Sequence, residues 1–214
     1  MRPKLSIRVV RTVVLLLATC SPPIRALAQA PTGFTWGVDG KGVLGNDLPH
    51  SNQNFPGPVS DHPAGCCLDR LVDIQGADTH SLALDASQRV FTWGSSYVGQ
   101  LGNGTNGVNA TSPIPVAVPG LLGRLPLSPT DESIAAEGGS NVVIDANGFV
   151  WTWGANDRGQ LGIGPPGPAV CGGPSPFVYP CSTVPVQVAL GAGDVVGVGA
   201  GTRHSLCLLY TSPS

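Results

Sequence analysis

The sequence predicts an all-β protein, a β-propeller built from blades of four-stranded antiparallel sheet. Two observations support this prediction. The 214 residues include 30 Gly and 21 Pro, which separate short segments rich in Val, Leu and Ile, and this pattern is typical of strands and turns. In addition, one aromatic motif recurs about every sixty residues, which indicates a repeat architecture.

The motif reads aromatic-Thr-Trp-Gly-x4-Gly-x-Leu-Gly and occurs three times without gaps, with its tryptophans 57 and then 60 residues apart. We expect its fixed residues to be structural, with Gly permitting tight turns, Leu filling the space between blades and Trp adding apolar area that one thin sheet cannot bury alone. The three tryptophans should then lie in like surroundings. These structural residues are Trp36, Gly37, Leu44, Trp93, Gly94, Leu101, Trp153, Gly154 and Leu161.

Each repeat translates into four short strands, which is the content of one propeller blade. In the later unit the turn at 145–148 carries Asn-Gly, which favours a hairpin between the second and third strands. In the middle unit the expected strands are 71–75, 80–84, 89–93 and 115–118, the last matched by 185–188 in the next unit.

A weaker element precedes the motif and contains His80 in one unit and His204 in a later one, with Asn141 expected to fill the same position between them. A catalytic or metal-binding histidine would not recur once per blade. We therefore interpret His80 and His204 as structural residues, each hydrogen-bonded at the start of a strand.

The run His-Ser-Leu-Ala-Leu, Thr-Trp-Gly and Gly-Gln-Leu-Gly within residues 80–102 resembles the repeat of the regulator of chromosome condensation family, and the resemblance extends from about Gly33 to Leu208. That family closes a ring of seven blades. The resemblance therefore implies about three blades and part of another. An open half-ring would leave two blade faces bare, which implies that the native protein is longer.

The first 28 residues have the three-part pattern of a secretory signal: a basic start, an apolar run at 13–18, and small residues at 26 and 28. The apolar run is too short to span a bilayer. We therefore expect an exported, bacterial-type member of the family, periplasmic or extracellular. The alternative is a lipoprotein signal with Cys20 as the lipidated residue.

These observations divide the chain into a signal peptide at 1–28 and a partial propeller at 31–208. The last residues, 209–214, fit no repeat position and are expected to be a non-native tail.

Removal of the signal leaves six Lys and Arg against 13 Asp and Glu, a net charge of −7. Binding to nucleic acid through phosphates needs clustered cations, and the six that remain are scattered singly. Nucleic acid is therefore not an expected partner, and no membrane span is expected.

No pattern of catalytic or cofactor-binding residues stands out, so we expect no catalytic residue and no cofactor. A Ser/His/Asp arrangement, a carboxylate pair and a phosphate-binding glycine loop are all missing from the sequence pattern. Residues 145–147 could begin a calcium loop, but no acidic residue follows at the distance needed to complete it. We interpret them as a hairpin turn and expect no metal site.

The cysteines of the repeat region fall mainly in insertions. Cys171 and Cys181 lie in the insertion at 165–183, and in an oxidising compartment we expect them to form a disulfide. Cys66 and Cys67 are adjacent in the insertion at 46–69 and could pair with each other or with a cysteine beyond this chain. A zinc site is the less favoured interpretation there.

Three insertions, at 46–69, 103–112 and 165–183, follow the same Leu-Gly element and should therefore emerge on one face of the propeller. Such a face either binds a partner or is decoration without function. We expect a non-enzymatic exported scaffold that binds a protein or a carbohydrate through these loops.

Three alternatives remain open. The family resemblance implies guanine-nucleotide exchange activity, although export and the negative charge argue against it. A propeller enzyme acting on an extracellular polymer would need charged groups converging on the central channel. The chain could also be one module of a larger surface protein.

Overall fold

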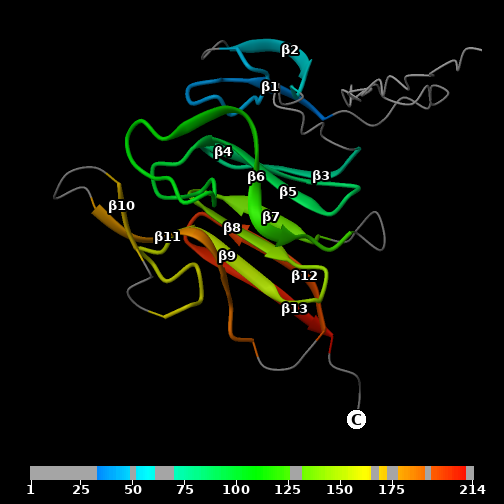
Figure 1. Cartoon of the computed structure of the whole chain (residues 1–214), viewed down its shortest axis with the longest axis vertical. Coiled ribbons are helices and arrows are strands. Elements are labelled where there is room, and N and C mark those ends of the chain that lie inside the picture. The colour runs from blue at the N-terminus through cyan, green and yellow to red at the C-terminus, as the bar shows by residue number, and fades with distance from the viewer. Residues whose placement is uncertain are drawn as a thin grey trace, which may run out of the picture.

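The computed structural model describes residues 33–48, 52–60, 70–125, 132–164, 169–172, 178–190 and 194–210. Within these ranges the chain forms thirteen strands, no helix, and only antiparallel pairs. The strands make four successive sheets (Figure 1). The all-β prediction is confirmed, and the sheets are the blades of a propeller arc.

The second sheet is a complete blade in which the four strands follow chain order, β3-β4-β5-β6. The strand expected at 115–118 is longer than predicted because Ser112 and Leu122 also pair with β5, across two register shifts. β6 lies at the edge of its sheet, where bulges and prolines are tolerated. The four strands are β3 (Leu71–Gly76), β4 (His80–Asp85), β5 (Arg89–Ser95) and β6 (Thr111–Leu122).

The third sheet repeats this order and adds one strand at its outer edge, which gives β7-β8-β9-β11-β10. The additional strand, β10, comes from the insertion at 165–183 and was not predicted. The strands are β7 (Ile134–Glu137), β8 (Ser140–Ile144), β9 (Val150–Ala155), β10 (Ala169–Gly172) and β11 (Val178–Gln187).

Each end of the described chain is a two-stranded half-blade. β1 (Phe34–Gly37) carries the first motif and pairs with β2 (Gln53–Pro58), so the two occupy the third and fourth strand positions of a blade. β12 (Asp194–Gly201) and β13 (His204–Tyr210) occupy the first and second positions. The described chain is therefore a half-blade, two complete blades and another half-blade.

The turn between the second and third strands of a blade is held by an aspartate. The Asp145 carboxylate accepts hydrogen bonds from the backbone N–H groups of Asn147 and Phe149, at 2.8 and 3.0 Å, and from the indole of Trp151 at 2.8 Å. Gly148 supplies the left-handed residue with φ of 87°. Both carboxylate oxygens of Asp145 accept hydrogen bonds from within the hairpin. This agrees with the interpretation of residues 145–147 as a hairpin turn.

The buried core lies between successive blades. Leu82, Leu84, Val90, Val118 and Leu121 of one blade pack with Ile134, Ala136, Val143 and Trp153 of the next. A smaller cluster joins Val59 to β4 and β5, and another joins the third sheet to β12 and β13. Each blade is thus stabilised mainly by its neighbours, as expected for a repeat protein.

Trp36 differs from its two counterparts. The side chains of Trp93 and Trp153 are fully buried, whereas Trp36 is 62% exposed. The expectation of like surroundings is therefore wrong for this residue. The physical reason is that no motif turn precedes β1 among the described residues, so no blade covers its indole.

Several predictions fall partly or wholly outside the described residues. The signal peptide at 1–28, Cys20, and Cys66 with Cys67 lie outside them. The propeller region is described from residue 33, and β13 continues to Tyr210, two residues into the expected tail. In the part of the chain that is described, no helix is long and apolar enough to cross a membrane.

Candidate functional site

The fixed spacing within the motif corresponds to a closed turn. The threonine hydroxyl donates to the leucine carbonyl nine residues later in all three copies, at 2.5 Å for Thr35, 2.7 Å for Thr92 and 2.8 Å for Thr152. These bonds hold the start and the end of the turn together. They explain why threonine, rather than another β-forming residue, recurs in the motif.

A second bond closes the same turn from its other side. The residue three positions after each tryptophan accepts the N–H of the motif leucine, with distances of 3.1 Å to Asp39, 3.4 Å to Ser96 and 3.1 Å to Asn156. The three residues differ in type but share a short polar side chain. The motif pattern did not include this position, although a polar residue there in every copy could have revealed it.

Successive blades are joined through the backbone carbonyl that precedes the motif leucine. The Gln100 carbonyl accepts the indole Nε1–H of Trp153 at 3.0 Å and the amide of Asn141 at 2.9 Å, both from the next blade. The Val43 carbonyl likewise accepts from Trp93 at 2.8 Å and from Ser81 at 2.9 Å. Trp93 and Trp153 therefore lie in equivalent surroundings.

The glycine after each motif leucine allows this close approach. A Cβ atom at Gly102 would lie 2.7 Å from the Trp153 Nε1 atom, and one at Gly45 would lie at the same distance from Trp93 Nε1. Both glycines also have a left-handed backbone, with φ of 65° and 64°. Any other residue would therefore move the indole and strain the turn.

The expected equivalence of Asn141 with His80 is wrong. Asn141 pairs with Trp153 as Ser81 pairs with Trp93, so Asn141 is the counterpart of Ser81. The weak element that precedes the motif has few residues in common between units. The sequence alignment of this element was therefore wrong by one position. His80 instead contacts Asn141 of the next blade, with 2.9 Å between His80 Nε2 and Asn141 Oδ1.

His80 is fully buried, and burial lowers its pKa to about 4, against a smaller opposing effect of the Asn141 hydrogen bond. Because Asn141 donates to Gln100 through its amide, its oxygen accepts from His80 Nε2–H. A neutral, structural histidine joins the two blades. His204, at the equivalent position of β13, is exposed.

The described parts of the three insertions lie next to one another. The Asp47 N–H of the first donates to the Pro113 carbonyl at 3.2 Å, where β6 leaves the second insertion, and the Gly104 N–H of the second donates to the Thr183 carbonyl of the third at 2.9 Å. The rings of Tyr97 and Tyr179 add a contact at 6.4 Å between centroids. The described residues of the insertions, 46–48, 52–60, 103–112, 169–172 and 178–183, are here called the insertion face.

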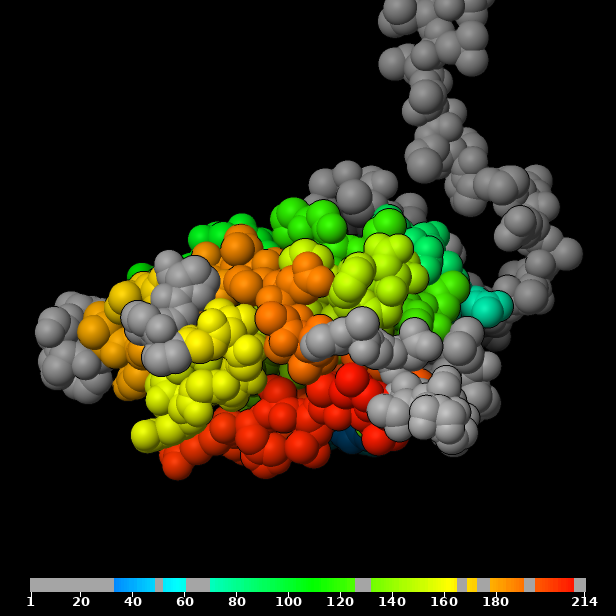
Figure 2. Space-filling view, turned by 90° about the horizontal axis from the view of Figure 1, so that it is seen from below, coloured from blue at the N-terminus to red at the C-terminus, as the bar shows by residue number. Residues whose placement is uncertain are grey.

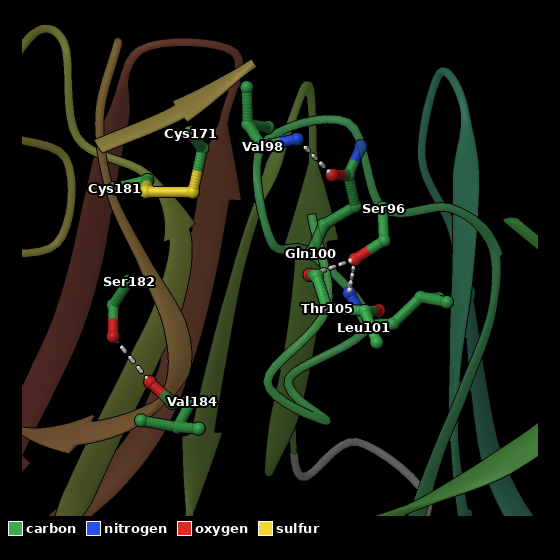
Figure 3. The surroundings of a disulfide bond; sticks show 9 residues. All are labelled: Ser96, Val98, Gln100, Leu101, Thr105, Cys171, Cys181, Ser182 and Val184. Atoms are coloured by element: carbon green, nitrogen blue, oxygen red, sulfur yellow. Dashed lines mark hydrogen bonds between the residues drawn. A yellow bond between two sulfur atoms is a disulfide. The ribbon is translucent and has the colours of Figure 1, made fainter. Parts of the chain in front are cut away.

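A disulfide joins Cys171 of β10 to Cys181 of β11, as predicted (Figure 3). Both cysteines are buried, and they lie close to the pairing of β11 with β9. In the neighbouring blade, Ser96 holds its own loop by donating to the Thr105 carbonyl at 2.8 Å. The loops of the insertion face are therefore fixed at their bases by covalent and hydrogen bonds.

Apolar side chains are exposed on this face. Val170 is 68% exposed and Val108 56% exposed, and Val178 and Tyr179 are also exposed. Val108 lies in a turn, and the other three lie on the paired strands β10 and β11. Exposed apolar side chains on one face are typical of protein-binding surfaces. No group of three His, Cys, Asp or Glu side chains that could hold a metal ion occurs among the residues described.

An arc of antiparallel blades, joined by buried tryptophans and bearing insertions on one face, defines a β-propeller repeat protein. The model of the regulator of chromosome condensation (RCC1) repeat matches residues 87–143 and 147–208. The chain belongs to this family.

Curated relatives include large ligases. The human E3 ubiquitin-protein ligase HERC2 is 31% identical over 186 residues, which is 85% of this chain but 3% of that protein. The human probable E3 ubiquitin-protein ligase HERC4 is 37% identical over 94 residues, 44% of this chain and 8% of that protein. The chain thus spans only a small part of these relatives.

Solved structures of similar fold cover most of the chain. Human WBSCR16 has a TM-score of 0.60 at 19% identity, with 83% of this chain and 40% of that chain covered. Yeast RCC1 (Prp20), solved with Kap60 bound, has a TM-score of 0.59 at 19% identity, with 83% and 37% covered. These likenesses show the fold, a partial arc of a seven-bladed ring.

Proposed function

We propose that this chain is part of an exported, non-enzymatic propeller that binds a protein partner through the insertion face. The observation that carries the proposal is the exposure of four apolar side chains on this face. Val108 lies in a turn of the second insertion, and Val170, Val178 and Tyr179 lie on the paired strands β10 and β11. Binding to a fixed surface costs less conformational entropy than binding to mobile loops.

The relatives support a protein as the partner. Yeast RCC1 has been solved with Kap60 bound, and Prp20p from Saccharomyces cerevisiae was characterised for its binding to Gsp1p and histones. These partners belong to those proteins. For this chain we propose only the general role, that of a propeller whose surface binds another protein.

Exchange activity or ligase activity is not part of the proposal. The alignment with HERC2 covers 3% of that protein, so the ligase activity of that protein is not transferred to this chain. The proposed export and the net charge of −7 beyond residue 28 both argue against a nuclear exchange factor.

A carbohydrate ligand is the second candidate because the partly exposed ring of Tyr179 could stack on a sugar.

The disulfide supports the export part of the proposal. Disulfides persist in oxidising compartments and are rare in the cytosol. Cys171 and Cys181 are correctly placed for a disulfide, with a Cα–Cα distance of 5.8 Å. A signal peptide at 1–28 would deliver the chain to such a compartment.

Site-specific photocrosslinking tests the proposed surface. A photoreactive amino acid is placed at Val170, on the insertion face, or at Phe149, which is 52% exposed at the opposite end of β9. We expect one defined protein adduct from exported material at position 170 and none at 149. Equal labelling from both positions would contradict the proposal, and binding to a glycan array alone would favour the carbohydrate candidate.

A further inference from the structure

The second insertion contains two tripeptides of the form Asn-x-Thr, at residues 103–105 (Asn-Gly-Thr) and 109–111 (Asn-Ala-Thr). In the 214 residues no other asparagine has Ser or Thr two positions later. The tripeptide is the acceptor pattern for N-linked glycans in exported proteins, provided that it lies on the surface. Asn, Gly and Thr are also common turn residues, so the surroundings of each asparagine decide whether it fits this role.

Asn109 lies at the tip of a tight turn. The Ala110 N–H donates to the Gly107 carbonyl at 3.1 Å, so Val108 and Asn109 are the two central residues of the turn, and both are exposed. The Ser96 N–H donates to the Ala110 carbonyl at 2.6 Å, which fixes the base of the turn. A bulky group on the Asn109 side chain can therefore extend into solvent without opening the turn.

Asn103 lies in different surroundings. It is half-buried, and its Oδ1 accepts the Thr105 N–H at 3.1 Å and the Thr105 hydroxyl at 2.6 Å. The Gly104 N–H donates to the Thr183 carbonyl of β11 at 2.9 Å, and the Ser96 hydroxyl donates to the Thr105 carbonyl at 2.8 Å (Figure 3). This tripeptide is thus held against a neighbouring insertion, and Asn109 is the better acceptor of the two.

The surface around this turn is apolar and uncharged. The second and third insertions, 103–112 and 165–183, contain no Asp, Glu, Lys or Arg, although Val108 and Val170 are exposed there. A Cβ atom at Gly107 would lie 3.8 Å from the Gly172 carbonyl oxygen, so the turn lies beside β10. Figure 2 shows β10 and β11, in yellow to orange, at the surface at one end of the molecule. A neutral, strongly hydrated glycan on Asn109 would keep this part of the surface in water.

We propose that Asn109 accepts an N-linked glycan when the chain is exported through a pathway that has an oligosaccharyltransferase. The proposal rests on the export part of the proposed function and not on the protein partner. The glycan would adjoin Val108, so a protein partner would contact the β10 and β11 side of the insertion face.

The donor substrate is a polyprenyl-diphosphate-linked oligosaccharide. The Asn109 Nδ2 atom forms a bond to the anomeric carbon of the first sugar, and the bond from that carbon to the diphosphate oxygen breaks. The polyprenyl diphosphate leaves with the bonding electrons, and one Nδ2 proton passes to a base of the transferase.

Asparagine variants of the full chain test the site in a eukaryotic secretory host. Each is expressed once with residues 1–28 and once with a leader of the host in their place, and retained and secreted material are measured together. We expect one glycan on the unaltered chain, seen as a gel-mobility shift that a peptide-N-glycosidase removes. Asn109→Gln should abolish the shift completely, and Asn103→Gln, the matched control, should leave it unchanged. A shift that persists in Asn109→Gln, in whole or in part, or no shift with the host's leader, would overturn the proposal.

Variants of Thr111 test whether the tripeptide is recognised. Thr111→Ser keeps the hydroxyl and should retain the glycan, whereas Thr111→Ala should lose it although Asn109 is still present. Thr111 is exposed, so both variants should keep the circular dichroism of the unaltered chain. Equal glycosylation of the two variants would contradict recognition of this tripeptide.

The two leaders separate this inference from the proposed function. A glycan that appears only with the host's leader supports Asn109 as the acceptor and shows that residues 1–28 do not export the chain. Export by residues 1–28 without a glycan refutes the inference and leaves the proposed function intact.

Discussion

The indole N–H of Trp153 donates a hydrogen bond of 3.0 Å to the backbone carbonyl of Gln100 in the preceding blade. The same carbonyl accepts the Asn141 amide, and Gly102, two residues further on, lies against the indole ring. One motif therefore supplies the turn and the next supplies the tryptophan that covers it. Adjacent copies of the repeat recognise each other through this relationship.

Replacing a covered tryptophan should destabilise the fold far more than replacing the uncovered one. Trp153→Ala empties a fully buried site and should lower the free energy of unfolding by about 3–5 kcal/mol. Trp36→Ala, at an exposed site, should cost under about 1 kcal/mol. Chemical denaturation of both variants at low protein concentration gives the comparison. Similar losses would mean that Trp36 is covered in solution.

Gly102 affects stability in two ways, through its contact with Trp153 and through its left-handed backbone, and the two effects can be measured separately. Gly102 and Gly162 occupy the same turn position with φ of 65° and 66°. Alanine at either should cost about 1–2 kcal/mol for the left-handed conformation. Gly102→Ala should cost about 1–3 kcal/mol more because its Cβ displaces the indole. Denaturation midpoints measure both. If the two losses are equal, the indole does not constrain the turn.

Stability should fall on acidification because of His80. Its folded pKa of about 4 lies below the ordinary value of 6.5, so the unfolded chain binds the proton more readily between these values. The stabilisation is complete above about pH 6.5 and is lost as the pH falls towards 4, by up to about 3 kcal/mol.

Thermal unfolding between pH 4 and pH 7 checks this effect. The difference in unfolding midpoint between the unaltered protein and His80→Gln should shrink as the pH falls, because only the unaltered protein carries the buried imidazole. A constant difference for His80→Gln would show that this histidine does not titrate as expected.

The disulfide should stabilise the hairpin of the third insertion. Cys171→Ala with Cys181→Ala removes a link between residues ten apart in sequence, which should cost roughly 2–3 kcal/mol. We expect the double variant to be cleaved by protease within 165–183 well before the rest of the chain. The unaltered protein in reducing agent is the matched control and should behave in the same way. Resistance of both would show that backbone pairing alone holds β10.

The repeat region was predictable because its constraints are local. Thr92, Gly94 and Leu101 act within a single turn, so their spacing in the sequence revealed the turn directly. The insertions were less predictable. β10 pairs with the outer edge of the third sheet. Its sequence is not part of the repeat, so no periodic pattern predicts this strand.

The offset between His80 and Asn141 also escaped the sequence pattern. Their hydrogen bond crosses two blades and joins residues 61 apart, so no local spacing encodes it. The polar residues Asp39, Ser96 and Asn156 differ in type and share only a position. Their common role becomes visible when the turns are superimposed in space.

The repeat, the strands of each blade and the disulfide could all be inferred from the order of residues, because each depends on residues close together in the chain. Which copies of the motif are covered became known only from the arrangement of the blades in space. Trp36 and Trp153 share one motif, yet one is 62% exposed and the other fully buried. Burial of a side chain in a repeat protein depends on whether a neighbouring blade covers it. The sequence of one motif does not show whether that blade is present.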